Sequence, residues 1–283
     1  MAILLRSTSN PWRIADILQK TRIIRGNLGM LDEIQGEIKE FSPDIIYHLA
    51  WEGVGNQFRN DLTQINNIPS TLNLIKKSKE FGCRKFVALG SQAEYGPKNG
   101  PISEAFPTTP TTLYGETKLA CGKISSRVAD ARGLDFAWLR LFSSYGPKDD
   151  PHWMIPYVIS QIHQGNSPDL TAGEQLWDYI YVTDVAEALW KVSISPGAKG
   201  FFNLGSGQAF PLRTIIEKIR DKINPDIPLN FGKIPYRPDQ VMHLEADITR
   251  LSTLAQWNPR INLDTGLHQT IDWYTSSERR AIQ

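Results

Sequence analysis

The chain contains little cysteine, and Cys83 and Cys121 stand far apart among its 283 residues. Neither lies in a Cys-x-x-Cys or Cys/His spacing, so we predict packing roles for both, no disulfide framework and no metal site. Apolar runs are also short, because Arg6 interrupts the apolar start and no run approaches the ~20 residues that span a bilayer. These absences predict a cytoplasmic protein without a membrane partner.

An excess of charge of one sign is missing as well. Lys and Arg total 31 against 30 Asp and Glu, which gives a formal net charge of +1, and the basic residues form no stripe. We therefore predict no nucleic-acid partner, because such a surface cannot neutralise a phosphate backbone. The hydrophobic content of 41% is sufficient for one large domain or two lobes with a substantial core.

A glycine-rich phosphate-binding loop is a third absence. The 21 glycines form no Gly-x-x-Gly-x-x-Gly or Gly-x-Gly-x-x-Gly run. In dinucleotide-binding proteins the backbone N–H groups of such a run hold a pyrophosphate at a helix N-terminus. The sequence thus lacks the glycine-rich loop that usually binds the pyrophosphate of a dinucleotide.

Apolar runs rich in β-branched and aromatic residues alternate with longer amphipathic ones. The runs that we predict as strands are Ala2–Leu5, Arg22–Arg25, Asp44–Leu49, Lys85–Leu89 and Asp135–Leu141. The clearest predicted helices are Asp61–Glu80, Tyr114–Ala131, Asp184–Ser193, Leu212–Lys222 and Leu267–Thr275. The alternation predicts an α/β fold with a doubly wound parallel sheet that helices cover on both faces.

Proline and glycine become frequent after Gly146 and break the chain into short pieces before Tyr179–Val182. We place the start of a smaller, mixed α/β lobe there. The predicted division assigns residues 1–146 and 177–204 to the larger domain, and residues 147–176 and 205–283 to the lobe.

Tyr114 and Lys118 stand four residues apart in a predicted helix, and Ser91 follows a predicted strand upstream. Spacing of i to i+4 places the phenol and the ammonium on one helix face. A positive charge ~4 Å from a phenol lowers its pKa from about 10 by up to ~3 units. We therefore predict that Tyr114 exchanges a proton with a substrate oxygen that Ser91 also holds, although this pair spacing also arises by chance.

Further motifs follow one another along nearly the whole chain. They are Gly26-Asn27-Leu28, His48-Leu49-Ala50, Asn67 with Thr71-Leu72-Asn73-Leu74, Gly90-Ser91 with Glu94-Tyr95-Gly96, Tyr114-x-x-x-Lys118, Leu139-Arg140, Tyr145-Gly146-Pro147, Asp178-Tyr179-Ile180-Tyr181-Val182 with Asp184-Val185-Ala186, Asn203-Leu204-Gly205-Ser206-Gly207, Arg237-Pro238-Asp239, Ala246-Asp247 and Trp273-Tyr274. In this order they resemble the extended short-chain dehydrogenase/reductase family (NAD-dependent epimerase/dehydratase), specifically its nucleotide-sugar branch. The resemblance implies a Rossmann-type dinucleotide-binding domain, a substrate-binding lobe and a homodimer paired through helices, one of which is Tyr114–Ala131.

Family members begin with a strand, a glycine-rich turn and a helix, whereas Ile3-Leu4-Leu5-Arg6 aligns with the family's second strand. About 25 residues of the first strand, turn and helix are therefore expected to be missing. The first strand is central in the order 3-2-1-4-5-6, so two ladders lose their partner. Either the polypeptide starts upstream, or the other strands re-pair across the gap, or another chain fills it. We expect weakened cofactor binding.

The resemblance implies NADP or NAD as the cofactor. The positions that would contact it are Arg6, Asn27, Leu28, Ala50, Asn67, Tyr114 and Lys118. Arg6 slightly favours NADP, because NAD-preferring relatives carry an acidic residue for the ribose hydroxyl there, and an arginine suits a 2′-phosphate. A solvated surface arginine is the alternative reading of Arg6.

The resemblance also implies a nucleotide-sugar substrate. The positions that would contact it are Ser91, Gln92, Ser143 and Arg237. In 4,6-dehydratases two carboxylates follow the serine or threonine, whereas this chain has Gln92 and Ala93. Glu94 would point the other way in an extended segment. We therefore predict no dehydration. Two structural readings are the alternatives to substrate binding. Arg237 would form an ion pair with Asp239, and Trp177 would be a core residue.

We predict a 4-ketoreductase or 4-epimerase that acts on a nucleoside-diphosphate hexose by hydride transfer. The catalytic residues would be Ser91, Tyr114 and Lys118. The alternative is a cofactor-free or truncated relative that serves binding or assembly without catalysis.

Overall fold

The computed structural model describes residues 1–237 and 240–276. The chain divides into two compact units. The first unit comprises Met1–Gly96, Pro107–Arg140 and Lys191–Phe202, and the second comprises Pro97–Phe106, Leu141–Trp190 and Asn203–Gln283. Because the chain passes between the units several times, neither unit is one continuous segment.

The first unit holds most of a four-stranded sheet of order β10-β6-β4-β3. Its strands are β3 (Ile45–His48), β4 (Lys85–Ser91), β6 (Asp135–Leu141) and β10 (Gly200–Leu204). β3 and β4 run parallel, with Ile45 opposite Lys85 and His48 opposite Ala88. Since parallel strands bring their carboxyl ends to the same edge, the segments that follow β3 and β4 emerge side by side.

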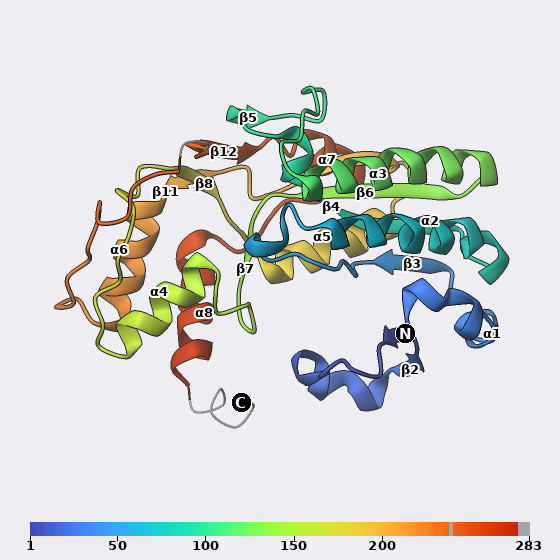
Figure 1. Cartoon of the computed structure of the whole chain (residues 1–283), viewed down its shortest axis with the longest axis horizontal. Coiled ribbons are helices and arrows are strands. Elements are labelled where there is room, and N and C mark those ends of the chain that lie inside the picture. The colour runs from blue at the N-terminus through green and yellow to red at the C-terminus, as the bar shows by residue number, and fades with distance from the viewer. Residues whose placement is uncertain (238–239, 277–283) are drawn as a thin grey trace. The chain divides into compact units, whose positions relative to one another are not determined.

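The first two strands form a sheet of their own. β1 (Ala2–Leu5) and β2 (Arg22–Arg25) pair in parallel from Ala2–Arg22 to Leu5–Arg25. Within the described residues neither pairs with β3, so the expected alternative of re-pairing across a gap is not observed. Figure 1 shows β2 set apart from β3 in this unit. β1 and β3 thus each keep one edge whose backbone groups belong to no ladder of the described chain.

Helices cover the sheet of the first unit. They are α1 (Leu31–Phe41), α2 (Asn67–Ser78) and α3 (Leu113–Arg132), with α5 (Val182–Ile194) divided between the units. The 3-10 segments of this unit are η1 (Trp12–Lys20), η2 (Leu28–Met30), η3 (Asn56–Phe58), η4 (Leu62–Asn66), η5 (Lys79–Phe81) and η6 (Gln92–Tyr95). In Figure 1, α2 and α3 lie beside each other across β3, β4 and β6.

The close fit of α3 on the sheet depends on a small residue. A Cβ at Gly122 would lie 2.9 Å from the Trp138 ring of β6, so a larger residue would force the helix away. Phe136 stacks between Phe86 and Trp138 in the same core, with ring centroids 6.4 and 6.2 Å apart. Thr112 begins the helix by accepting a hydrogen bond from the Gly115 N–H, and Gly133 ends it in the left-handed region.

Lys85 is a buried lysine with a structural role at the start of β4. Its ammonium donates to the carbonyls of Val192 and Ser195, at the end of α5, at 2.5 and 2.9 Å. Burial lowers the Lys85 pKa to about 8. Val192 lies in the last turn of α5 and Ser195 directly follows the helix. The carbonyls of a last turn have no partners within the helix itself.

The second unit contains a mixed four-stranded sheet of order β11-β8-β12-β5. Its strands are β5 (Asn99–Ile102), β8 (Leu176–Asp178), β11 (Ala209–Pro211) and β12 (His243–Ala246). β12 runs parallel to β5 and β8, whereas β11 runs antiparallel to β8. A short parallel pair, β7 (Ser144–Tyr145) and β9 (Ile180–Tyr181), completes the strands described there, and the helices are α4 (Met154–His163), α6 (Leu212–Ile223), α7 (Thr249–Ala255) and α8 (Leu263–Thr275).

Asp178 holds three segments of the second unit together. Its Oδ1 accepts from the N–H and the hydroxyl of Ser206, at 2.7 and 2.6 Å. Its Oδ2 accepts from the N–H groups of Gly207 and Ala246, at 3.1 and 3.0 Å. The carboxylate is fully buried. The Asp178-Tyr179-Ile180-Tyr181-Val182 motif therefore has a structural role at its first residue.

Most predicted elements lie where the sequence pattern placed them. β1, β2 and β6 have the predicted bounds, and α3 differs from the prediction by one residue at each end. The predicted helix Asp61–Glu80 instead divides into η4, α2 and η5. Pro69 explains part of this division, because proline lacks an N–H and is tolerated in the first turn of α2. Among the helices of the described residues, none combines the length and apolar character of a membrane span.

Candidate active site

Ser91 ends β4 and caps the turn η6 that follows it. Its hydroxyl accepts from the Ala93 N–H at 3.2 Å, and the Glu94 carboxylate accepts from the Ser91 N–H at 2.9 Å. This reciprocal arrangement is a capping box, which fixes both ends of a short helical turn. The segment is helical and not extended, so the condition under which Glu94 was expected to point the other way is not met, and Glu94 is fully buried.

Glu94 is the centre of a buried polar cluster. Besides the Ser91 N–H, its carboxylate accepts from the Trp138 indole and the Arg140 Nε, each at 2.8 Å. Arg140 also donates to the Tyr95 hydroxyl at 2.8 Å. Since each member is hydrogen-bonded, the ion pair is tolerated in the core, and it ties the turn after Ser91 to β6.

Tyr114 stands in the first turn of α3 and is 6% exposed. The Ser91 side chain is close enough to act on its hydroxyl, and the Trp51 ring meets it edge to face with centroids 6.2 Å apart. Burial raises the Tyr114 pKa, whereas the Ser91 hydrogen bond and the Arg59 charge lower it by less. In this arrangement removal from water has the larger effect on the phenol, and the lowering of its pKa by Lys118 stays a prediction.

Lys118 lies one turn further along α3 and is 4% exposed. Its Nζ donates to the Leu89 carbonyl at 2.8 Å and lies 3.6 Å from the Trp51 ring centroid, but 6.0 Å from the Tyr114 ring centroid. Burial lowers the Lys118 pKa to about 7, against a raising effect of Glu94. The helix spacing therefore brings the pair to one face, while the ammonium is directed to β4 and to Trp51.

Two residues that the sequence did not indicate contact the pair. Arg59 places its Cζ 4.2 Å from the Tyr114 ring centroid, and Trp51 lies over Lys118. The Trp51 indole donates to the Gln64 side chain at 2.9 Å. Neither Trp51 nor Arg59 has a regular spacing to the motif, so we found no sequence signal that would have identified them.

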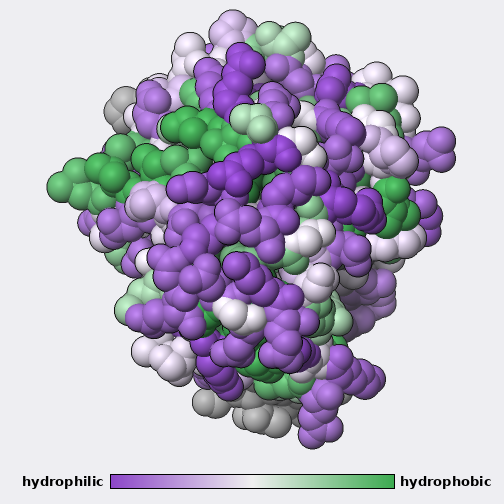
Figure 2. All heavy atoms as spheres, turned by 90° about the vertical axis from the view of Figure 1, so that its right-hand side faces the viewer, coloured by the Kyte–Doolittle hydropathy of each residue, from purple (hydrophilic) through white to green (hydrophobic). Residues whose placement is uncertain are grey.

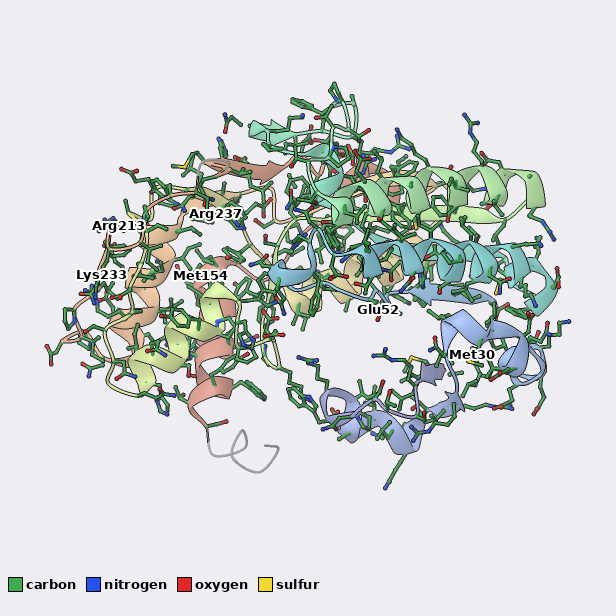
Figure 3. The ribbon with its side chains drawn as sticks, viewed as in Figure 1. Met30, Glu52, Met154, Arg213, Lys233 and Arg237 are labelled. Carbon is green, nitrogen blue, oxygen red and sulfur yellow. The ribbon has the colours of Figure 1, made fainter. Side chains whose placement is uncertain are left out.

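Asn67 and Ala50 were both predicted to face the cofactor. The Asn67 side chain accepts from the Glu52 N–H at 2.8 Å and donates to the carbonyls of Glu52 and Gln64, each at 3.1 Å. Its amide therefore holds the loop after β3. Ala50 is exposed just beyond that strand, and Figure 3 shows Glu52 on the side of the sheet that faces Met30.

Arg6, Asn27 and Leu28 lie beyond the ends of the two-stranded sheet. The Gly26 N–H donates to the Leu5 carbonyl at 3.2 Å, which places the segments after β1 and β2 next to each other. Arg6 and Asn27 are exposed, Leu28 is half-buried, and Asn27 accepts from the Gly29 N–H at 2.9 Å. Exposed polar side chains at the carboxyl ends of parallel strands are consistent with a ligand there.

The described residues fit the nicotinamide end of a dinucleotide better than its pyrophosphate. Ser91, Tyr114 and Lys118 offer a hydroxyl, a phenol and an ammonium at the end of β4, as the reactive part of the cofactor requires. The described residues, by contrast, contain no Gly-x-x-Gly-x-x-Gly or Gly-x-Gly-x-x-Gly turn that leads from a strand into a helix. The pyrophosphate thus lacks its usual backbone donors.

The predicted substrate positions are distributed over both units. Ser91 and the half-buried Gln92 belong to the first unit, and Ser143 and Arg237 to the second. Within the second unit, Ser143 accepts from the Trp177 indole at 2.8 Å, so Trp177 has a polar partner. Arg237, labelled in Figure 3, is exposed, while its neighbours in the motif, residues 238–239, lie outside the described residues.

The order of motifs, the fold and the grouping of Ser91 with Tyr114 agree with a match at the level of the family. The profile described as "NAD dependent epimerase/dehydratase family" covers residues 3–205. The chain belongs to this family. The match begins at residue 3 and gives no support to the expected loss of a first strand, turn and helix.

Two of the similar proteins are named as UDP-sugar 4-epimerases. The chain is 29% identical to a UDP-glucose 4-epimerase of Halalkalibacterium halodurans over 301 residues, which covers 92% of this chain and 87% of the relative. It is 30% identical to a UDP-glucuronate 4-epimerase of Thermodesulfobacterium geofontis over 241 residues, which covers 82% and 73%.

Solved structures confirm the predicted fold class, a Rossmann-like α/β fold with a mixed lobe. A UDP-N-acetylglucosamine 4-epimerase of Methanobrevibacter ruminantium matches with a TM-score of 0.86 and 26% identity, covering 96% of this chain and 89% of that one. A Thermus thermophilus UDP-glucose 4-epimerase in complex with NAD matches with a TM-score of 0.82 and 21% identity, covering 98% and 100%. At the latter identity the likeness concerns the fold.

Proposed function

We propose that this protein is a nucleotide-sugar 4-epimerase or 4-ketoreductase that uses a nicotinamide dinucleotide. The observation that supports this most directly is that Tyr114 and Lys118 lie on one face of α3, with Ser91 at the end of β4 close enough to act on the phenol. Relatives named as UDP-sugar 4-epimerases support the substrate class. A ketone at C4 is the species common to reduction and epimerisation of a hexose.

Each residue has a separate role in the proposal. Ser91 donates a hydrogen bond to the sugar oxygen, and Tyr114 gives or takes the proton of that oxygen. Lys118 binds the ribose hydroxyls and supplies positive charge near the phenol. The nicotinamide, when bound, supplies or accepts the hydride at the adjacent carbon. The low exposure of Tyr114 and Lys118 keeps competing water from this proton transfer.

We propose hydride chemistry without elimination of water. Elimination requires an acid and a base next to the sugar, and the two positions after Ser91 hold Gln92 and Ala93. Glu94 is the nearest carboxylate in the sequence, but it is buried against Trp138 and Arg140. The side chains of this turn therefore offer no carboxylate for dehydration.

For the cofactor we propose NAD or NADP, with Arg6 as the residue that would contact a 2′-phosphate. Arg6 is exposed directly after β1, where a guanidinium can pair with a phosphate. The family description and the NAD complexes among similar structures favour NAD. A comparison of both dinucleotides therefore belongs in every assay.

The test is conversion of a UDP-hexose, followed by NMR of the sugar, with NAD or NADP present. We expect slow 4-epimerisation or, with a 4-keto substrate and reduced cofactor, formation of the alcohol. Tyr114→Phe should lower turnover at least about 100-fold, because the phenol oxygen is lost while the ring still packs against Trp51. Unchanged turnover in a correctly folded Tyr114→Phe protein would refute the assignment.

A second candidate is a non-catalytic relative that binds a nucleotide sugar. The buried phenol with a raised pKa and the absence of a glycine-rich loop favour it. Calorimetry with a UDP-hexose and no dinucleotide separates the two. Tight binding of the sugar together with no detectable dinucleotide binding would support the second candidate.

We also propose that a second copy of the chain is the partner, through the face that carries α3. Ile124 of α3 is 43% exposed, and Leu62 and Ile65 of η4 are 75% and 47% exposed. η4 packs against α3, so these apolar side chains lie on neighbouring elements. Most of the face drawn in Figure 2 is polar, with apolar residues gathered near its left edge.

We also propose a division of the chain by ligand. Residues 1–146 and 177–204 would bind the dinucleotide, and residues 147–176 and 205–283 would bind the sugar.

A further inference from the structure

The cation closest to the Tyr114 ring is Arg59, which belongs to the loop after β3. Its Cζ lies 4.2 Å from the ring centroid, whereas the Lys118 Nζ lies 6.0 Å away. Lys118 is also engaged elsewhere, with the Leu89 carbonyl and the Trp51 ring. A guanidinium over an aromatic face is attracted to the ring, and more strongly once the phenol carries a negative charge.

The backbone fixes Arg59 in this position. The Tyr114 N–H donates to the Arg59 carbonyl at 2.8 Å, and the neighbouring Leu113 N–H donates to the Asn60 side chain at 3.0 Å. Both donors belong to the first turn of α3, which has N–H groups without partners inside the helix. The loop therefore caps the helix on which the tyrosine stands.

The loop itself is held from inside by Gln64. This buried amide donates to the carbonyls of Gly53 and Phe58 at 2.6 and 3.0 Å, and accepts from Trp51. The Arg59 N–H donates to the Asn56 carbonyl at 3.3 Å. Arg59 is thus part of an ordered turn rather than a free surface chain.

Lys118 and Arg59 differ in how readily they lose their charge. Burial lowers the Lys118 pKa to about 7, so its charge is partial at neutral pH. A guanidinium is not deprotonated in proteins. Among the described residues, no Asp or Glu forms an ion pair with Arg59. Its charge is therefore available to the phenol.

We propose that Arg59 is a positioning residue, which anchors the first turn of α3 and stabilises the ionised form of Tyr114. This extends the proposed function, on which its catalytic meaning rests. The other groups near the phenol are Ser91 of β4, whose side chain favours ionisation, and Glu94 of η6, whose charge opposes it. The Lys118 ammonium lies 6.0 Å from the ring centroid. Arg59 acts against the effects of Glu94 and burial.

The experiment follows the ionisation of Tyr114 without requiring turnover. Protein labelled with ¹³C at the tyrosine Cζ is titrated with alkali, and Tyr114→Phe identifies the resonance. In Arg59→Met, the resonance should titrate at least about 1 pH unit higher than in the wild type. Arg59→Lys, which keeps a charge, should restore part of this shift, and Lys118→Met should cause a smaller one.

Arg13→Met is the matched control, because Arg13 stacks on Trp12 at 4.9 Å as Arg59 does on Tyr114. It should leave the titration unchanged. If Arg59→Met does not fold, Arg59→Gln should give the same upward shift. Coincident titrations of wild type and Arg59→Met, a larger effect of Lys118→Met, or no titration of the wild type before alkaline unfolding would each overturn the proposal. A shift in a protein that turns over no sugar would leave it standing and count against the proposed function alone.

Discussion

Replacing Glu94 by glutamine removes the negative charge from the buried cluster behind Ser91. The amide keeps the shape of the side chain but has one oxygen where the carboxylate has two. Oε1 accepts from Ser91 and Trp138, and Oε2 accepts from Arg140. Whichever way the amide turns, its NH₂ group faces at least one buried donor.

The expected loss is about 3–5 kcal/mol in the free energy of unfolding, because one partner of a buried ion pair remains without its counter-charge. A domain of ordinary stability has about 5–15 kcal/mol, so the variant should fold but melt early. Urea denaturation followed by tryptophan fluorescence measures the change, since Trp138 belongs to the cluster. The transition of the first unit is the relevant one.

Two comparisons make the result specific. Asp135→Asn breaks the partly exposed pair between Asp135 and Lys199, at 2.6 Å, and should cost at most about 1 kcal/mol. Glu94→Met combined with Arg140→Met should recover much of the loss, because removing both charges leaves neither unpaired. A loss below about 1 kcal/mol in Glu94→Gln, or no recovery in the double variant, would refute the reasoning.

Two further predictions concern buried charges elsewhere. Asp178→Asn should lower the free energy of unfolding of the second unit by about 2–6 kcal/mol, since its NH₂ group would face two of the four donors that the carboxylate accepts from; a loss under about 1 kcal/mol in urea denaturation would contradict this. For Lys85, whose pKa is about 8 in the folded chain against about 10.4 unfolded, the unfolded state binds more protons between these values. The free energy of unfolding of the wild type, relative to that of Lys85→Met, should therefore rise by up to about 1 kcal/mol per pH unit between pH values of about 8 and 10. Thermal melts of both proteins at several pH values measure this difference. A difference that stays flat or falls with pH would show that burial does not lower the Lys85 pKa.

The candidate site was predictable to the extent that it depends on spacing. Four residues along a helix bring Tyr114 and Lys118 to one face in any surrounding, and the parallel sheet places Ser91 at the end of β4 beside them. The buried Cys83 and Cys121 agree with their predicted packing roles. Patterns of this kind carry over from sequence to structure because they are properties of one element.

The direction of each side chain depended on other elements. Asn67 was predicted to contact the cofactor, and this stays a prediction, whereas its amide is observed to bond to the Glu52 loop. Glu94 turned inward because Trp138 and Arg140, far along the chain, offer it donors in the core. A buried carboxylate lies where hydrogen-bond donors are available, and the packing of β6 against β4 provides the donors here.

The sequence by itself determined the α/β alternation, the family and the placement of Tyr114 and Lys118 on one helix face, because periodicity and motif order are properties of neighbouring residues. The tertiary structure decided which charges act on the phenol. Lys118 is directed to Leu89 and Trp51, and Arg59 reaches the Tyr114 ring. The acidity of a buried group depends on distance and burial, and neither quantity exists until distant segments of the chain have packed together.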